Sequence, residues 1–307
     1  MNYIGFDTSN YTTSVASFDG CEGMNCSKLL PVKQGELGLR QSDAVFAHIK
    51  GLPELSGRLF SHISTDTIAA VGVSTRPRAV DGSYMPCFMV GYTQATLLAD
   101  SLHIPLFEFS HQQGHVAASL WSAGHLELMD QPHLAWHLSG GTTELLLVEP
   151  EGKNVRCTRI GGTSDISAGQ LIDRTGKLLE LPFPSGKHLD ALSRTAQGRE
   201  VFKVKCPGME LSLSGVQNKV EAFHRANGDA AETAAYALRC VCAAVMLATK
   251  NALKAYPGLR VVFSGGVASN SMLRRELAPL EPIFSEPQYS TDNAMGIAVL
   301  TARAMEE

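Results

Sequence analysis

The sequence lacks the features that mark several broad classes of protein. Its 307 residues contain no C-x-x-C pair, and its seven cysteines are scattered and odd in number, so no disulfide framework is indicated. The segment Met1–Asp7 has no basic region followed by an apolar run and does not resemble a signal peptide. No stretch reaches the roughly 18 apolar residues of a membrane span. We therefore expect a reduced, cytoplasmic protein with no membrane partner.

The chain also has little net charge. Its 26 basic and 30 acidic residues give a formal charge of -4, which argues against a general nucleic-acid coat protein because phosphate contacts need clustered Lys and Arg. A local basic patch remains compatible with this balance. The hydrophobic content of 44% is enough to build a core, and the length suits one large domain or two lobes.

Short β-type runs alternate with longer helical patterns, which predicts an α/β fold. Two predicted hairpins share one pattern of strand, polar Gly/Ser/Thr turn and strand: one spans Tyr3–Asp19 and the other Leu134–Glu149. Such a repeat is expected of duplicated lobes that hold a nucleotide triphosphate. We place the lobe boundary near Asp130, which gives an N-terminal lobe of residues 1–130 and a C-terminal lobe of residues 131–307. Helices are expected at Leu39–Ile63, Cys87–Leu102, His111–Ser122, Ala168–Glu180, Gly215–Arg225, Ala230–Ala255 and Asp292–Ala304.

A histidine pair is the first candidate for chemistry. His111 and His115 are four residues apart at the start of a helical pattern, so both imidazoles project from one face, close enough to share an ion. Local hydrogen bonding at a helix start is the alternative. A zinc protease of the H-E-x-x-H type is excluded, because Gln112 stands where the general base would be and an amide cannot take up a proton.

Glycine-rich turns are the second candidate. Ser139-Gly140-Gly141-Thr142 follows an apolar strand, and its backbone N–H groups could approach an anion, although a ligand-free hairpin turn fits equally. Ser264–Asn270 joins a buried strand to a helical pattern, an arrangement typical of nucleotide sites, in which Asn270 is either a ligand or a helix cap. Asp173 and Asp190 flank the turn at Gly186 and could hold ribose hydroxyls, although solvated helix residues show the same isolated pattern. Taken by itself, Asp292 is most simply interpreted as the N-cap of the last predicted helix.

Taken together, these segments resemble one family along nearly the whole chain: the threonylcarbamoyl transferases of tRNA modification (TsaD type), formerly described as O-sialoglycoprotein endopeptidases. Seven motifs of the family occur here in the family's order. They are N-H-x-E-G-H at Ser110–His115, V-S-G-G-H-T at Leu138–Thr143, D-D-A-A-G-E-A-F-D-K at Asp165–Arg174, Y-P-G-G at Phe183–Gly186, F-S-F-S-G at Leu211–Gly215, G-G-V-x-x-N at Gly265–Asn270 and T-D-N-G-A-M at Thr291–Met295.

The resemblance implies the actin-like ATPase and sugar-kinase fold, with two duplicated lobes around a nucleotide cleft. It implies one divalent metal per chain, iron or zinc, held by His111, His115 and Asp292. It also implies ATP or an adenylate as ligand, and tRNA as the acceptor of a threonylcarbamoyl group at N6 of adenosine 37. No catalytic side chain is identified. The implied nucleotide and substrate contacts are Leu138, Ser139, Gly140, Gly141, Thr142, Asp173, Gly186, Asp190 and Asn270.

The chain departs from the family pattern around the implied donor and acceptor pocket. The family's C-D-E-T loop reads Asn10-Tyr11-Thr12-Thr13, and its G-P-G-L stretch is replaced by Arg76–Tyr84, where Arg76 and Arg78 could clamp an anion. The family's motif glutamate and histidine are Gln113 and Thr142. Two alternatives therefore stay open: a paralogous carbamoyl-type transferase with a non-tRNA acceptor, and a non-catalytic nucleotide-binding partner of an actin-like paralogous subunit.

Overall fold

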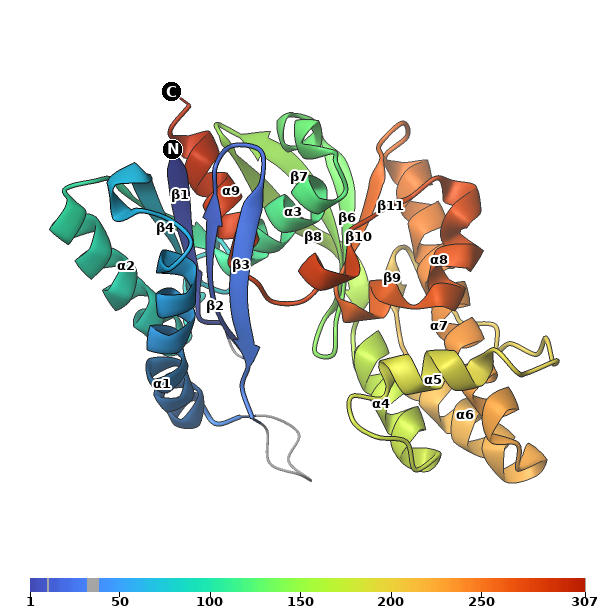
Figure 1. Cartoon of the computed structure of the whole chain (residues 1–307). Coiled ribbons are helices and arrows are strands. Elements are labelled where there is room, and N and C mark those ends of the chain that lie inside the picture. The colour runs from blue at the N-terminus through green and yellow to red at the C-terminus, as the bar shows by residue number, and fades with distance from the viewer. Residues whose placement is uncertain (10, 32–38, 307) are drawn as a thin grey trace. The chain divides into compact units, whose positions relative to one another are not determined.

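The computed structural model describes residues 1–9, 11–31 and 39–306, which form two compact units (Figure 1). Unit 1 comprises Met1–Gln131, Glu149–Cys157 and Asp292–Glu307, and unit 2 comprises Pro132–Val148 and Thr158–Thr291. The first break in the chain lies beside the boundary expected near Asp130. The division nevertheless differs from two continuous lobes, because residues 149–157 and the last helix pack with unit 1.

Unit 1 is built on a five-stranded sheet in the order β3-β2-β1-β4-β5. The first three strands are antiparallel neighbours, whereas β1, β4 and β5 run parallel to one another. The carboxyl ends of β1 and β5 therefore lie at the same edge, on either side of β4. The strands are β1 (Asn2–Asp7), β2 (Thr12–Phe18), β3 (Gly23–Leu29), β4 (Ile68–Arg76) and β5 (Leu106–Ser110).

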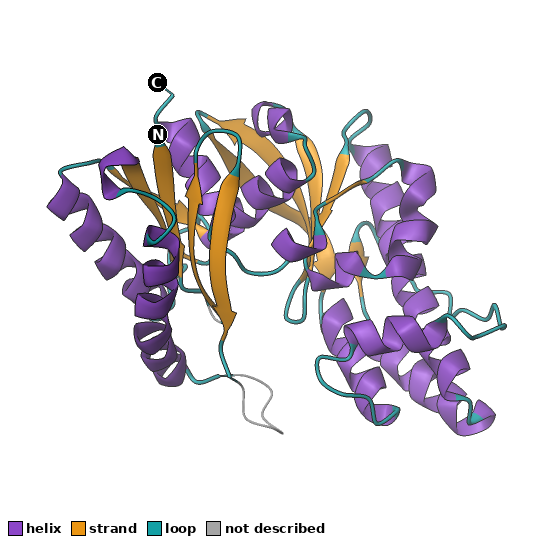
Figure 2. Cartoon of the chain, in the orientation of Figure 1, coloured by secondary structure: helices purple, strands orange, loops and turns teal. Residues whose placement is uncertain are grey.

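In the described part of unit 1, four α-helices pack against this sheet (Figure 2). They are α1 (Gln41–Phe60), α2 (Phe88–Leu102), α3 (His111–Ser122) and α9 (Met295–Ala304). Ile4, Val71 and Leu55 are buried in the core between the sheet and α1. Helix α9, made from the last described residues, packs against β1, β2, β4 and α3.

Unit 2 repeats the topology of unit 1. Its sheet has the order β11-β10-β6-β7-β8-β9, in which β6 pairs antiparallel with β7 and parallel with β10, as β1 does with β2 and β4. The duplication predicted from the two hairpins is thereby confirmed. The strands are β6 (His133–Leu138), β7 (Thr143–Glu151), β8 (Asn154–Thr163), β9 (Glu210–Leu211), β10 (Val261–Ser264) and β11 (Ile283–Phe284).

The helices of unit 2 are α4 (Ala168–Leu178), α5 (Gly186–Ser193), α6 (Ser214–Asn227), α7 (Ala230–Ala255) and α8 (Ser271–Leu277). Among the described residues, α7 is the one helix with the length and apolar composition of a membrane span. Its small side chains pack into the core of unit 2, where Ala234, Ala237 and Ala244 have no exposed surface. Burial of that kind is the ordinary reason for an apolar helix in a folded domain.

Candidate metal centre and nucleotide site

Three side chains from distant parts of the chain meet in unit 1. One ligand atom from each of His111, His115 and Asp292 can be chosen so that all three lie within 4.8 Å of one another. The Nε2 atoms of the two histidines are 2.9 Å apart. The Oδ1 atom of Asp292 lies 3.5 Å from Nε2 of His111 and 3.3 Å from that of His115. The structure thus brings together the three predicted metal ligands.

Local sequence fixes the histidine pair at the first turn of α3. Ser110 ends β5 and caps the helix: its Oγ accepts from the backbone N–H of Gln113 at 3.3 Å, and Gln113 Oε1 accepts from the backbone N–H of Ser110 at 2.9 Å. This reciprocal capping box starts the helix at His111. His111 and His115 then share one helix face, with 18% and 8% of their side-chain surface exposed.

Asp292 reaches the histidines because α9 lies directly against α3. A Cβ atom added to Gly296 would overlap the carbonyl oxygen of Gly114, so the two helices meet backbone to backbone at these glycines. Helix α9 begins at Met295, three residues after Asp292, and Ala294 occupies the N-cap position. The reading of Asp292 as an N-cap is therefore wrong: its carboxylate faces the histidines instead.

The charges in this cluster support one another. Burial lowers the pKa of His111, but the carboxylates of Asp7 and Asp292 act in the opposite direction and raise it to about 10. Burial raises the pKa of Asp292, and its contacts with His111 and His115 outweigh that effect and hold it well below its usual range. In the absence of a cation, a proton on His111 compensates the buried negative charge.

The spacing of the three atoms fits a divalent transition metal. A cation with ligand bonds of about 2.1 Å places neighbouring ligand atoms about 3.0–3.4 Å apart in tetrahedral or octahedral geometry. The observed separations of 2.9, 3.3 and 3.5 Å lie close to that range. Two imidazoles and a carboxylate suit iron or zinc, and three protein ligands leave coordination positions for a substrate.

In unit 2, the predicted nucleotide contacts form a connected set. Asp173 on α4 accepts a hydrogen bond through Oδ1 from the backbone N–H of Ser185 at 2.8 Å, directly before Gly186. Asp190, one turn further along α5, accepts from Ser271 Oγ at 2.8 Å. Ser271 follows Asn270, whose Oδ1 caps α8 by accepting from the backbone N–H of Leu273 at 3.0 Å. Asn270 therefore serves as a helix cap, and its Oδ1 is already occupied.

The predicted glycine turn lies beside the start of α4. Ser139 closes the turn by accepting through Oγ from the backbone N–H of Thr142 at 3.0 Å, and Ser167 Oγ donates to the carbonyl of Gly140 at 2.7 Å. Gly140 and Gly141 are exposed, and nothing lies within 4 Å of a Cβ added to either. The turn therefore offers an open backbone surface. Leu138, by contrast, is fully buried in the core and can contribute only its main chain.

Asp165 anchors the segment that leads into α4. Its carboxylate accepts hydrogen bonds from Ser212 Oγ at 2.7 Å and from the backbone N–H groups of Leu213 and Ser214 at 2.8 and 3.1 Å. Partial burial raises the pKa of Asp165, but these donors outweigh it and lower the pKa to about 2. Asp165 thus joins two loops.

Comparison with known proteins identifies the family. The family model described as "TsaD: tRNA N6-adenosine threonylcarbamoyltransferase" matches residues 38–299. A tRNA N6-adenosine threonylcarbamoyltransferase from Carboxydothermus hydrogenoformans is 31% identical over 264 residues, which is 82% of this chain and 75% of that protein. The chain belongs to the TsaD family. The resemblance inferred from the ordered motifs is confirmed, and with it the assignment to transferases that act on tRNA.

Solved structures agree on the fold. HypF from T. kodakarensis aligns with a TM-score of 0.65 at 12% identity, covering 99% of this chain and 47% of that one, so the chain spans about half the length of HypF. Component A of the (R)-2-hydroxyglutaryl-CoA dehydratase of Acidaminococcus fermentans gives 0.58 at 14% identity over 99% of both chains. The ROK hexokinase of Thermus thermophilus gives 0.54 at 14% identity over the full length of both. These likenesses confirm the predicted actin-like fold.

One departure from the TsaD pattern has a structural reason. Gln113, which stands where the family has glutamate, is 4% exposed, and its Nε2 donates to the carbonyl of Val155 at 2.8 Å while its Oε1 completes the cap of α3. The amide donates with its nitrogen and accepts with its oxygen, whereas an ionised glutamate could only accept. Gln113 therefore belongs to the packing beneath the helix, and its presence leaves His111 and His115 in place.

Among the other departures, the segment at Arg76 lies close to the helix that carries the histidines. Tyr11 is half-buried and Thr12 buried at the start of β2, while Asn10 lies outside the described residues. Arg76 ends β4 opposite Ser110, and the carbonyl of Pro77 accepts from the backbone N–H of Gln112 at 3.0 Å. The segment at Arg76 thus runs beside the start of α3. Arg78, two residues on, is exposed.

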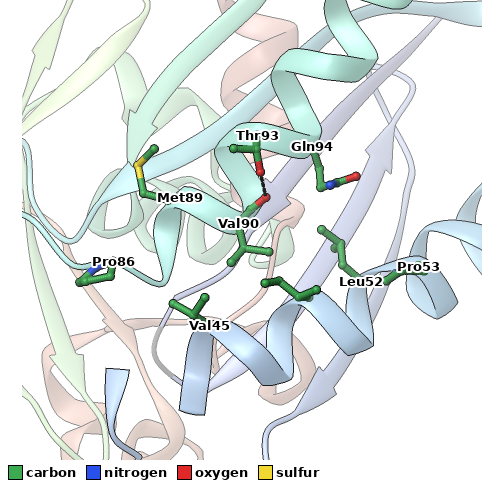
Figure 3. Close-up of a pocket in the computed structure, with 9 residues that line it drawn as sticks. Val45, Leu52, Pro53, Pro86, Met89, Val90, Thr93 and Gln94 are labelled. Atoms are coloured by element: carbon green, nitrogen blue, oxygen red, sulfur yellow. Dashed lines mark hydrogen bonds between the residues drawn. The ribbon is translucent and has the colours of Figure 1, made fainter. Parts of the chain in front are cut away.

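An apolar groove of about 420 Å³ lies between α1 and α2 (Figure 3). Its lining contains no titratable side chain, so it cannot supply proton transfer. No sequence pattern predicts this groove, since its residues come from two separate helical patterns. The lining residues are Val45, Ile49, Leu52, Pro53, Pro86, Met89, Val90, Thr93 and Gln94.

Sequence reasoning did not place Asp7 among the site residues. Asp7 ends β1 and is 1% exposed, and its Oδ2 lies 2.7 Å from Nδ1 of His111. A usable signal was present: Asp7 closes one buried strand and His111 follows another. In parallel sheets the residues after the carboxyl ends of neighbouring strands gather at one edge, where ligands bind.

Proposed function

We propose that the chain transfers a threonylcarbamoyl group from an adenylate donor to N6 of adenosine 37 of tRNA, with one divalent metal held by His111, His115 and Asp292. The observation that carries the proposal is the convergence of these three ligand atoms within 4.8 Å in a member of a family of that activity. A scaffold without chemistry would have no need to gather two imidazoles around a buried carboxylate.

The bound metal would act as a Lewis acid on an oxygen of the donor. The protein itself would hold the metal ligands around that oxygen in fixed positions. The capping box of α3 and the contact between Gly114 and Gly296 set the positions of the ligands His111, His115 and Asp292. Fixed ligands need no reorganisation when negative charge develops in the reaction.

The adenylate would be held by residues of unit 2. We assign its phosphate to the turn from Ser139 to Thr142, whose glycines leave the backbone open, and its ribose to Asp173, Asp190 and the backbone at Gly186. Asn270 retains its Nδ2 group for a base or ribose contact. Full-length HypF, one of the solved structures with this fold, is described in a phosphate- and nucleotide-bound form, which agrees with a nucleotide ligand.

Arg76, Arg78, Tyr11 and Thr12 would shape the donor and acceptor pocket. The backbone beside Arg76 is hydrogen-bonded to the first turn of α3 through Pro77 and Gln112, which brings this basic segment to the metal helix. A guanidinium there can bind the anionic phosphate or carboxylate of the donor through two parallel hydrogen bonds. Arg76→Ala and Arg78→Ala should then raise the KM for the donor, with metal content unchanged.

A rescue experiment tests the proposal. The gene is introduced into a strain that lacks its own threonylcarbamoyl transferase, and threonylcarbamoyladenosine in tRNA is measured by mass spectrometry. Restoration by the wild type and its loss in Asp292→Ala support the proposal. A metal-loaded protein that restores nothing indicates a non-tRNA acceptor. A protein that takes up no metal and restores nothing indicates a partner subunit without catalysis of its own.

A further inference from the structure

We propose that Asp7 is a positioning residue that holds His111 in the one orientation in which its Nε2 atom faces His115 and Asp292. The proposal rests on the metal site put forward above and adds to it a residue that does not itself touch the metal. Asp7 is separated from His111 by 104 residues, so the contact depends on the fold and not on local sequence.

Both oxygens of the Asp7 carboxylate have a defined partner. Oδ2 lies 2.7 Å from Nδ1 of His111, and Oδ1 accepts the backbone N–H of Ser9 at 2.9 Å. The side chain is 1% exposed, so water does not compete for either position. Because Ser9 belongs to the turn that follows β1, the carboxylate is fixed to its own strand end and can in turn fix the imidazole ring.

This contact determines which nitrogen of His111 carries the proton. An ionised carboxylate can only accept hydrogen bonds, so Nδ1 must be the protonated nitrogen that donates to Asp7. Without a cation Nε2 carries the second proton; if a cation takes the place of that proton, the neutral ring has its lone pair on Nε2, the atom that lies 2.9 Å from Nε2 of His115. A carboxylate that accepts from the outer nitrogen of a metal-binding histidine fixes ring and tautomer, and its removal weakens metal binding by about 10- to 100-fold.

Asp7 is not placed to be a fourth ligand. Its oxygen faces Nδ1, on the opposite side of the imidazole from Nε2, where Asp292 approaches. The group of possible ligands among the described residues comprises His111, His115 and Asp292 without Asp7. The geometry therefore separates two carboxylates by role: Asp292 faces the cation position, and Asp7 faces the back of the ring.

The test compares Asp7→Asn with Asp19→Asn in the full chain. Asp19 follows β2 and, like Asp7, accepts a backbone N–H two residues ahead, from Cys21 at 2.8 Å, but no histidine contact involves it. Co²⁺ binding is followed by its visible absorption in competition with a chelator, and folding by urea titration. We expect a 10- to 100-fold weaker Co²⁺ affinity in Asp7→Asn and an unchanged affinity in Asp19→Asn.

A second readout separates positioning from a purely structural role. In the Zn²⁺-loaded wild type, the ¹⁵N–¹H spectrum should show a slowly exchanging Nδ1–H of His111, and Asp7→Asn should lose or shift it. Lower stability with unchanged Co²⁺ affinity would overturn the proposal. If Asp7→Asn does not fold, Asp7→Ser takes its place with the same expected loss. Equal affinity of variant and wild type refutes the role of Asp7 alone, whereas no Co²⁺ uptake by the wild type refutes the metal site itself.

Discussion

The contact between α3 and α9 can be tested with a single methyl group. In Gly296→Ala the new Cβ would overlap the carbonyl oxygen of Gly114 and lie 2.7 Å from its carbonyl carbon and 2.8 Å from the backbone nitrogen of Ala118. All three atoms are backbone and cannot rotate away. The helices must therefore move apart by about 1 Å or more to restore ordinary contact distances.

The expected loss of stability follows from two opposing terms. Overpacking of this kind lowers the free energy of unfolding by up to about 3 kcal/mol. Replacing glycine by alanine within a helix raises it by about 1 kcal/mol, because alanine has the higher helix propensity. The free energy of unfolding should thus fall by about 2 kcal/mol. The same movement widens the separations of 3.3 and 3.5 Å between Asp292 and the histidines, so Co²⁺ affinity should fall as well.

Urea unfolding and Co²⁺ titration of Gly296→Ala measure both effects. Gly57→Ala is the matched control, because Gly57 lies inside α1 with nothing within 4 Å of an added Cβ. The free energy of unfolding of Gly57→Ala should rise by about 0.5–1 kcal/mol, and the variant should bind Co²⁺ as the wild type does. A Gly296→Ala protein with wild-type stability and wild-type Co²⁺ affinity would refute the close contact.

Four further outcomes are expected. His111→Ala and Asp292→Ala should each abolish the one bound metal per chain, as measured by elemental analysis, and unchanged stoichiometry would exclude these ligands. Asp173→Ala should weaken nucleotide binding by about 1.5–3 kcal/mol in calorimetry, since it removes a charged hydrogen-bonding group; equal affinity would contradict the assignment. Gln113→Glu, which restores the family residue, should lower stability because a carboxylate cannot donate, yet leave Co²⁺ binding intact. The hydrogen bonds that lower the pKa of Asp165 to about 2 stabilise the fold only while its carboxyl group is ionised. The difference in free energy of unfolding between wild type and Asp165→Asn should therefore be complete above about pH 4 and disappear as the pH falls toward 2. A difference that does not change with pH in urea titrations would rule this out.

Much of the fold could be predicted from the sequence because the local sequence patterns agree with the tertiary structure. Helices α3 and α7 begin and end where the patterns predicted, at His111–Ser122 and Ala230–Ala255. Each has a side-chain cap at its start, Ser110 for the first and Asp229 for the second. The repeated hairpin pattern likewise predicted duplicated lobes, since turn chemistry and alternation are local properties. The hairpins β1–β2 and β6–β7 are antiparallel pairs in both sheets.

What the sequence did not reveal depends on contacts between distant segments. Nothing near Asp292 shows that α9 packs in unit 1, because the decisive contact is with Gly114, far earlier in the chain. The role of Asp7 depends in the same way on the parallel pairing of β1, β4 and β5. Gln113 resembled a lost functional group until its bond to Val155 showed an amide with a packing role.

The return of the last helix to unit 1 has a consequence for biosynthesis. Unit 1 receives most of its chain by Gln131, but Asp292 and α9 emerge only after about 160 more residues, which takes roughly 8–30 s at ribosomal rates of 5–20 residues per second. During that interval the face of β1 that α9 covers, at Gly5, has no permanent neighbour. This surface is open to chaperones during that time, and the proposed metal site is complete only once residue 292 has left the ribosome.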